Sequence, residues 1–324
     1  MKKSRKVWLI IALLMMVVGV GFASVGTAMG GRWGMIFDWD NFRIVSTSKE
    51  IVSDKVSIDG SFKKLDIKTS TVDVNIKVGN ENTLEYKVPE AYKPEITTVG
   101  NTLSVVTRER NGFTLFNFDF GRDEESYINI TLTEDMFKEF MNLEFSTSTG
   151  DLYIDSVDIT GHIETSTGDV RLTGLKSNGI SIDGSTSDVY ISDCNINGSL
   201  KTSLSTGEVI IKNLVITEKY EAETSTGDIE ISHSEIPWFI MDGSTSDLKV
   251  KSSEMNKVEV NTNTGDVELE LNGNEKDYEI KLHTSTGDMN VCGREMDGKS
   301  YESPSAEKKI NVQTSTGDID IYLN

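Results

Sequence analysis

The sequence is poor in the residues that usually mark a catalytic, metal-binding or disulfide-stabilised protein. It has two cysteines, four prolines and three histidines among 324 residues. His162, His233 and His283 each stand alone, and the motifs H-E-x-x-H, C-x-x-C and G-x-S-x-G are absent. We therefore expect no enzyme, no catalytic residue and no bound cofactor.

The two cysteines are also too far apart in the sequence pattern to pair. Cys194 and Cys292 fall about five repeat units apart. At about 4.8 Å per unit, they lie well beyond the distance of about 7 Å that a disulfide can bridge. We predict no Cys194–Cys292 bond.

Positive charge is outnumbered by negative charge. Lys and Arg number 32 against 52 Asp and Glu, which gives a formal net charge of −20. Such a surface repels nucleic-acid phosphates and anionic lipids. The composition excludes nucleic acid as a partner and suits an exposed extracytoplasmic domain.

The N-terminus predicts export. Four basic residues precede an uncharged, largely apolar run over residues 7–31. The basic end stays in the cytoplasm. Residues 1–31 then form either a transmembrane anchor or a signal peptide cleaved after Gly26-Thr27-Ala28. The length of the run and the aromatic residues just beyond it favour a single-pass anchor in the cell membrane, with the C-terminal domain extracytoplasmic.

The second half of the chain repeats the turn T-S-T-G-D. The first six intervals between its acidic positions are 18, 19, 20, 20, 19 and 19 residues. A constant period near 20 predicts a solenoid. The acidic positions are Asp151, Asp169, Asp188, Glu208, Asp228, Asp247, Asp266, Asp288 and Asp318.

Within each unit, apolar and polar residues alternate before and after the turn. Val170 and Leu172 follow one turn, and Ile229 and Ile231 follow another. Strict alternation is typical of a half-buried strand. A third apolar side lies six and eight residues past the acidic position, which gives most of each unit an inward column and favours one coil per unit over a row of hairpins joined by two-residue turns. The pattern predicts an all-β fold, a parallel β-helix with one coil of about 19–20 residues per unit.

The N-terminal part of the exported region is less regular. We predict a stalk over residues 32–60 and an irregular β cap over 61–145 that begins the solenoid, because Thr69–Asp73 is a degenerate copy of the turn. Thr133-Glu134-Asp135 predicts a short helix with an N-cap. The regular solenoid covers 146–324, with an insertion near 296–309.

The acidic column allows two interpretations. In the favoured one, each carboxylate accepts hydrogen bonds from backbone N–H groups of the turn and from nearby Ser or Thr. In the other, carboxylates of successive coils share Ca²⁺ ions. The calcium candidates are Asp151, Asp169, Asp188, Asp228, Asp247, Asp266 and Asp288.

The residues also resemble a known family. The basic-then-apolar start, the run Tyr127–Leu132 leading into Leu143–Asp151, and the later T-S-T-G-D turns are similar to the bacterial putative-adhesin β-strand-repeat family. The layout is similar to the LiaG-like membrane-anchored proteins of Gram-positive bacteria. The resemblance covers roughly residues 60–324. It implies an envelope protein, sometimes found alongside cell-envelope stress systems, and it supplies no catalytic residues.

These observations predict a non-enzymatic, membrane-tethered extracytoplasmic solenoid for adhesion or for protein or glycan interaction at the bacterial cell envelope. The alternative is an accessory or sensor component of a cell-envelope stress response. A remote alternative is a polysaccharide lyase or hydrolase, which would need two carboxylates in different environments where the repeat supplies equivalent ones. The expected partner is a cell-surface protein, a glycan or an envelope-stress membrane protein.

Overall fold

The computed structural model describes residues 51–58, 60, 62–107 and 126–324, with Met15, Gly19 and the backbone of three further strands. The chain divides into two compact units. Unit 1 holds Met1–Val52, Pro89–Ala91 and Glu109–Glu125, and unit 2 holds Ser53–Val88, Tyr92–Arg108 and Ser126–Asn324.

Unit 1 contains a small antiparallel sheet in the order β2-β1-β9. Its strands are β1 (Trp33–Asp38), β2 (Arg43–Ser46) and β9 (Gly112–Phe118). The predicted anchor over residues 1–31 lies outside the described residues, apart from Met15 and Gly19. In the part of the chain that is described, no helix is both long enough and apolar enough to span a bilayer.

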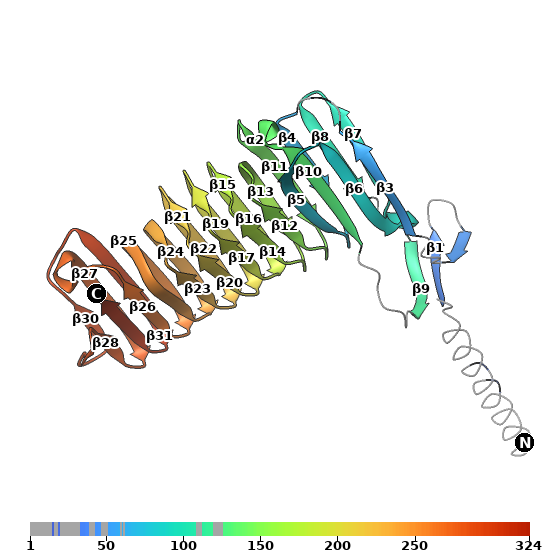
Figure 1. The fold of residues 1–324 in the computed structure, drawn as a ribbon. Coiled ribbons are helices and arrows are strands. Elements are labelled where there is room, and N and C mark those ends of the chain that lie inside the picture. Colours follow the sequence, from blue (N-terminus) through green and yellow to red (C-terminus); the bar gives the residue numbers. More distant parts are fainter. Residues whose placement is uncertain are drawn as a thin grey trace, which may run out of the picture. The chain divides into compact units, whose positions relative to one another are not determined.

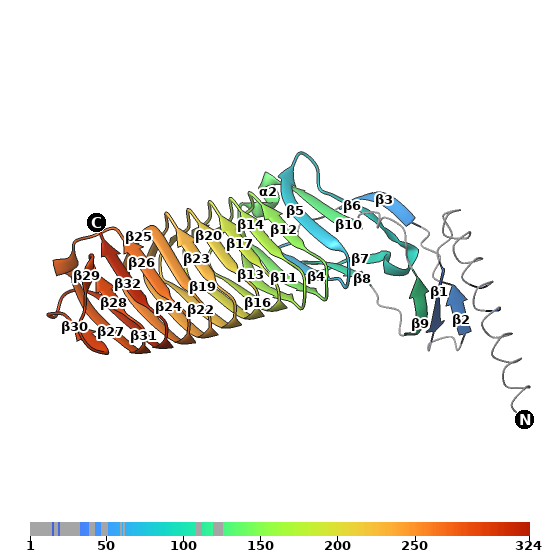
Figure 2. The same ribbon diagram turned by 90° about the horizontal axis from the view of Figure 1, so that it is seen from below.

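Unit 2 is a stack of coils, seen from two directions in Figures 1 and 2. Strands that lead into the repeated turn form what we call the pre-turn sheet, and strands that leave it form the post-turn sheet. The pre-turn strands are β4 (Lys64–Lys68), β11 (Met141–Thr147), β13 (Ile159–Thr165), β16 (Ile180–Thr186), β19 (Leu200–Thr206), β22 (Lys219–Thr226), β24 (Glu235–Thr245), β25 (Leu248–Thr264), β27 (Tyr278–Thr286) and β31 (Lys308–Thr316). The post-turn strands are β5 (Asp73–Gly79), β12 (Leu152–Asp155), β14 (Val170–Thr173), β17 (Val189–Ser192), β20 (Val209–Lys212), β23 (Ile229–Ser232), the start of β25, β26 (Val267–Leu271), β28 (Met289–Val291) and β32 (Ile319–Leu323).

The remaining elements form the third side and the two ends. The third side carries β15 (Lys176–Ser177), β18 (Asn195–Ile196) and β21 (Val215–Ile216). The N-terminal end carries β3 (Ile51–Ser57), β6 (Thr83–Pro89), β7 (Pro94–Val99), β8 (Thr102–Thr107), β10 (Tyr127–Thr133) and α2 (Glu134–Phe137), and the C-terminal end carries η2 (Glu275–Asp277), β29 (Arg294–Glu295) and β30 (Ser300–Glu302). The predicted short helix is thus present, with Thr133 at its N-cap, although the Thr133 side chain makes no capping hydrogen bond. A short 3₁₀ helix, η1 (Glu90–Tyr92), follows β6 in the chain.

Successive coils pair in parallel and in register, as the repeat predicted. Val170 pairs with Val189, Val189 with Val209, and Val209 with Ile229. All four side chains are buried. The third-side residues predicted to point inward are buried as well, among them Val157, Leu175, Cys194, Leu214, Ile196 and Met255. Stacking equivalent aliphatic residues gives a continuous core that no single coil could form alone.

The stack begins before the regular repeats. β4 pairs in parallel with β11, and β5 pairs in parallel with β12. Thr69–Asp73 joins β4 to β5 and is therefore the turn of a first coil. Beyond that coil, β8 and β10 continue the parallel pairing, and β7 and β6 then pair with them antiparallel.

The C-terminal coils do not follow the order of the sequence, which corrects the expectation that each coil lies on the one before it. β31 pairs with β25 on one side and with β27 on the other, and β32 likewise lies between β26 and β28. The last coil of the chain thus fills the place between its two predecessors. β29 and β30 add antiparallel pairing to β28 and β27, so those strands belong at the outer end, where exposed edges need cover.

The glycine of the turn is required by the close approach of neighbouring coils. A Cβ on Gly168 would lie 1.9 Å from the carbonyl oxygen of Gly150, and one on Gly227 would lie 1.9 Å from that of Gly207. Gly227 also has a φ of +151°, while Gly168 is not in the left-handed region. Close packing, more than backbone conformation, therefore explains why this position stays small.

Candidate functional site

The acidic positions of the turns form a hydrogen-bonded ladder along the stack. At all but one step, the backbone N–H of one acidic residue donates to a carboxylate Oδ1 of the neighbouring coil. Asp169 N lies 2.9 Å from Asp151 Oδ1, and Asp266 N lies 2.8 Å from Asp247 Oδ1. The other steps join Asp151 to Asp73, Asp188 to Asp169, Glu208 to Asp188, Asp247 to Asp228, Asp318 to Asp266 and Asp288 to Asp318. We call this the Asp ladder.

The ladder confirms the hydrogen-bonding interpretation of the acidic column, but with a different donor. The N–H groups come from the neighbouring coil and not from the residue's own turn. Inside the first regular turns, a threonine hydroxyl already accepts from the glycine, with Gly168 N 2.9 Å from Thr165 Oγ1. Among the described residues, the step from Asp228 to Glu208 has no such bond, because the longer Glu side chain places its oxygens differently.

The structure brings the seven calcium candidates into one column, each on a separate coil. Within the described chain, no group of three or more His, Cys, Asp or Glu side chains has the geometry to hold a metal ion. Calcium binding stays a prediction.

One part of the ladder is covered by large side chains. Tyr153, Arg171 and Tyr190 occupy one outward column of the post-turn sheet, two residues past each acidic position. The Arg171 guanidinium carbon lies 4.7 Å from the Tyr190 ring centroid and 5.4 Å from that of Tyr153. Arg171 also donates to Asp169 Oδ2 at 3.1 Å, and the Tyr153 hydroxyl donates to Asp151 Oδ2 at 2.9 Å. These contacts occupy the second carboxylate oxygen, and Asp151, Asp169 and Asp188 are half-buried.

In the covered part of the ladder, burial raises the pKa of several groups. Burial raises the pKa of the Asp169 carboxyl, and the neighbouring Asp151 and Asp188 add to that effect against the opposing influence of the Asp188 N–H and Arg171. Burial also raises the pKa of the Tyr153 and Tyr190 hydroxyls. At the inner face, burial raises the pKa of the Cys194 thiol to about 11, which keeps it protonated.

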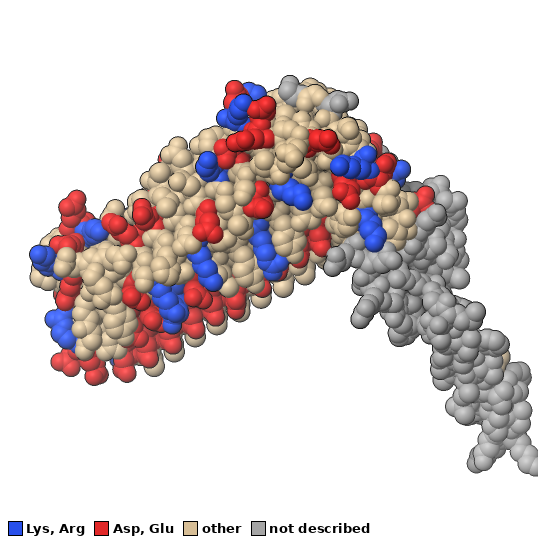
Figure 3. Space-filling view, in the orientation of Figure 1, with Lys and Arg blue, Asp and Glu red and all other residues tan. Residues whose placement is uncertain are grey.

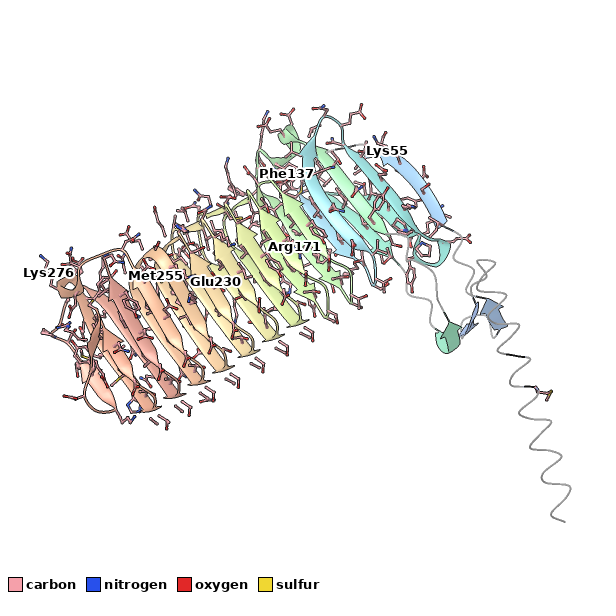
Figure 4. The ribbon with its side chains drawn as sticks, turned by 60° about the horizontal axis from the view of Figure 1, so that its bottom comes forward. Lys55, Phe137, Arg171, Glu230, Met255 and Lys276 are labelled. Carbon is pink, nitrogen blue, oxygen red and sulfur yellow. The ribbon has the colours of Figure 1, made fainter. Side chains whose placement is uncertain are left out.

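The other part of the ladder is open. In the same outward column, Ile210, Glu230 and Lys249 replace the Tyr-Arg-Tyr stack. Figure 4 labels Arg171 of the covered part and Glu230 of the open part. The acidic residues from this part of the stack are exposed: Glu208, Asp228, Asp247, Asp266, Asp318 and Asp288. Acidic side chains line one long edge of the stack over its C-terminal coils (Figure 3).

Shallow grooves lie on the outer face of the pre-turn sheet. One is lined by residues of β24, β25 and β31 and has a volume of about 310 Å³. A second, of about 190 Å³, is lined by residues of β25, β27 and β31. A third lies nearer the N-terminal end, over β13, β16 and β19, where Lys201 and Ser181 contribute to its lining. The first two share Glu259 and Asn311, so they adjoin one another.

The side chains around these adjoining grooves come in rows, one row for each coil. In the β25 row, Lys257 Nζ lies 2.7 Å from Glu259. In the β27 row, Lys281 Nζ lies 2.9 Å from Glu279. The β31 row between them holds Lys309, Asn311 and Gln313, which pair in register with both neighbouring rows.

A tryptophan lies at the end of this surface. Trp238 of β24 pairs with Lys219 on one side and Lys257 on the other. The Lys257 ammonium lies 3.9 Å from the indole centroid and the Lys219 ammonium 5.9 Å from it. Trp238 Nε1 is buried and finds no hydrogen-bond acceptor in the described part of the chain.

The structure leaves the three histidines apart, as the sequence indicated. His162 Nδ1 lies 2.8 Å from Ser181 Oγ, and His283 Nδ1 lies 2.8 Å from Ser300 Oγ. His233 is exposed at a corner with a φ of +51°. Cys194 and Cys292 are both free.

The groove residues were not singled out from the sequence. Alternation along Lys308–Thr316 does place Lys309, Asn311 and Gln313 outward. What the sequence could not supply was the neighbours of this strand, because they depend on the position of the last coil between two earlier ones.

Comparisons with known proteins give a family match over most of the chain. The sequence profile described as Toastrack DUF4097 matches residues 62–322. No curated protein matches.

Several solved structures are similar. One is a "putative adhesin" from Bacteroides fragilis NCTC 9343, with 14% identity, 63% of this chain and 98% of that chain covered, and a TM-score of 0.40. Another is a "putative lipid binding protein" from Parabacteroides distasonis ATCC 8503, with 13% identity, coverage of 84% and 98%, and a TM-score of 0.39. A third is a "putative cell adhesion protein" from Clostridium sporogenes ATCC 15579, with 14% identity, coverage of 85% and 100%, and a TM-score of 0.28.

Proposed function

The chain belongs to the Toastrack DUF4097 family, and from that premise we propose that it is a non-enzymatic, membrane-tethered solenoid that binds a surface protein or a glycan at the bacterial cell envelope. Binding takes place on the outer face of the pre-turn sheet. The N-terminal segment holds the protein in the cell membrane, and unit 2 lies on the extracytoplasmic side.

The observation that carries this proposal is the gathering of shallow grooves on one face. Grooves near the N-terminal end and near the C-terminal end both lie on the pre-turn sheet. The strands beneath them are fixed by parallel pairing on both sides and by a buried core. A surface whose side chains are already held in place loses little conformational freedom on binding, which favours recognition of an extended partner.

The tether rests on the sequence. The basic residues Lys2, Lys3, Arg5 and Lys6 precede the apolar run over residues 7–31, and aromatic residues follow it. This arrangement supports an anchor with its basic end inside the cell. The acidic composition of the remainder suits a domain that stands away from anionic lipid.

The proposal is tested by site-specific photo-crosslinking with the full-length chain in intact membranes. A photoreactive amino acid is placed at Ser203 or Asn261 on the pre-turn face, and, as the matched control, at the half-buried Glu230 on the post-turn face. We expect adducts with surface protein or glycan from the first two positions and none from Glu230. Equal adducts from all three positions, or none from any, would contradict the assignment of the face.

A second measurement addresses the absence of catalysis. The purified chain is incubated with cell-wall polysaccharide and the products are separated by size. Unchanged polymer is the expected result, and new reducing or unsaturated ends would show that the remote alternative, a lyase or hydrolase, is correct.

A further inference from the structure

We infer that the adjoining grooves over β24, β25, β31 and β27 bind a linear, uncharged glycan whose chain runs along the axis of the stack. This inference rests on the proposed function, since it names the ligand class for one part of the same face. The contacts come from the row contributed by β31.

The first argument is that this row has free hydrogen-bonding groups. Asn311 and Gln313 carry side-chain amides that make no hydrogen bond within the described chain, and Lys309 has no ion pair within it at 4 Å or less. The charged side chains of the neighbouring rows already have partners, because Lys257 is paired with Glu259 and Lys281 with Glu279. An amide offers both a donor and an acceptor, as a sugar hydroxyl does. The row therefore presents the chemistry that recognises hydroxyl or acetamido groups.

The second argument concerns charge. The cations that line the smaller groove are Lys257, Lys281 and Lys309, and its carboxylates are Glu259 and Glu279. The larger groove adds the carboxylate of Asp242, to which the Asn261 amide donates at 3.4 Å. The two signs balance across the surface, so neither a polyanion nor a polycation gains from it. Charge complementarity favours an uncharged polymer.

The third argument is the repeat along the axis. Equivalent positions recur from coil to coil at the strand spacing of about 4.8 Å. This distance is close to the length of one pyranose unit in an extended chain. A glycan lying along the axis therefore meets the same side-chain position at each sugar, as from Asp242 to Asn261 to Gln313.

The last argument links the groove to the order of the coils. The rows of β25 and β27 lie on either side of β31 because the final coil is inserted between them. Without that insertion, Lys257 and Glu259 would lie directly beside Glu279 and Lys281, and no free amide would separate them. The unpaired amides in the groove are thus a consequence of the position of the last coil between β25 and β27.

The test is isothermal titration of the full-length chain with β-1,4-linked N-acetylglucosamine oligomers of two, four and six units and with glucose oligomers of matched length. We expect one of the two series to bind more tightly as its length increases from two to six. The Asn311→Ala/Gln313→Ala variant should bind that series about tenfold or more weakly, since each amide contributes one or more hydrogen bonds. The matched control is Asn195→Ala, which removes an exposed amide from the third side and should bind as the parent does.

Thermal unfolding of the parent, the double variant and Asn195→Ala shows whether weaker binding comes from loss of the fold. The double variant should melt within a few degrees of the parent, because both side chains point outward from an intact coil. Failure of both sugar series to bind the parent would overturn the inference. The inference would also be overturned if the double variant bound as tightly as the parent, or if Asn195→Ala lost as much binding as the double variant. If crosslinks still form from Asn261 while no glycan binds, the proposed function stands and the glycan assignment alone is wrong.

Discussion

The covered and the open parts of the Asp ladder have the same backbone and different surfaces. In both, the backbone N–H of an acidic residue donates to the carboxylate of the preceding coil. In the covered part, the Tyr153-Arg171-Tyr190 stack occupies the second carboxylate oxygens. In the open part, Asp228, Asp247 and Asp266 are exposed.

The difference shows that the repeat determines the stack, while the outward residues determine how far its carboxylates are covered. A carboxylate that stabilises the turn through Oδ1 leaves its other oxygen available for a second role. Stacked aromatic and guanidinium groups use that capacity for stability in one region. In the other region it remains available to solvent.

The largest expected effect concerns what the two parts share. Gly168→Ala in the covered part and Gly227→Ala in the open part each place a Cβ at 1.9 Å from a carbonyl oxygen of the neighbouring coil. Both should lower the free energy of unfolding by about 3 kcal/mol or more, because neither coil can move without breaking its pairing. Chemical denaturation measures the change. The control is Gly298→Ala, where φ is +88° but the described chain has nothing within 4 Å of the added Cβ, so its smaller loss reports the cost of the left-handed backbone alone. A mild effect of either turn substitution would show that the coils are less closely packed than the structure has them.

A smaller effect should separate the two parts. Arg171→Ala removes the stack on Tyr153 and Tyr190 and the bond to Asp169, and should lower stability by about 1 kcal/mol after screening by solvent. Lys249→Ala, at a site of similar exposure with an ion pair to Glu268, should lower it by clearly less, because a solvent-exposed ion pair contributes little. Arg171→Lys should fall between them, because an ammonium keeps the charge and loses the planar fork. Equal effects of the two alanine substitutions would remove the distinction between a covered and an open ladder.

The smallest expected effect is in the pH dependence of stability. The folded-state pKa of Asp169 is raised above its ordinary value of 3.8, mainly by burial. Above that value the folded protein binds more proton at this site than the unfolded chain does, so this group lowers stability as pH rises through the window above 3.8. Asp169→Asn keeps an oxygen for the Asp188 N–H and removes the titration. Between pH 4 and neutrality, its stability should rise relative to that of the parent.

Urea unfolding at a series of pH values measures that difference. Asp247→Asn in the open part serves as the matched substitution for charge removal in the ladder. The prediction fails if Asp169→Asn loses stability relative to the parent as pH rises.

Much of the fold could be predicted from the sequence because the same alternation of apolar and polar residues recurs around every turn. Alternation around Val170, Val189 and Ile229 places each of them inside, and the T-S-T-G-D period stacks them. The family resemblance is confirmed by the match over residues 62–322. The glycine of the turn recurs with the repeat, and the structure shows that close backbone approach requires it.

The order of the last coils could not be read from the sequence. Turns at Asp266, Asp288 and Asp318 look equivalent, and no local property says which coil pairs with which. Capping decides it, because β29 and β30 pair with β28 and β27 and place that coil at the end of the stack. The surface around Lys309, Asn311 and Gln313 depends on that order, so the candidate groove could not be predicted from the sequence either.

The most direct measurement is therefore a comparison of distances between spin labels on the exposed positions Thr264, Thr286 and Thr316, taken in pairs. The background carries Cys292→Ser, while Cys194 is buried and its raised pKa keeps the thiol unreactive. If the last coil lies between its predecessors, Thr264–Thr316 and Thr286–Thr316 are each one strand spacing apart, about 5 Å at the backbone, and Thr264–Thr286 is about 10 Å apart. Dipolar broadening should be strong for the first two pairs and clearly weaker for the third. Strongest broadening for Thr264–Thr286 with the weakest for Thr264–Thr316 would show coils stacked in chain order and would contradict the account.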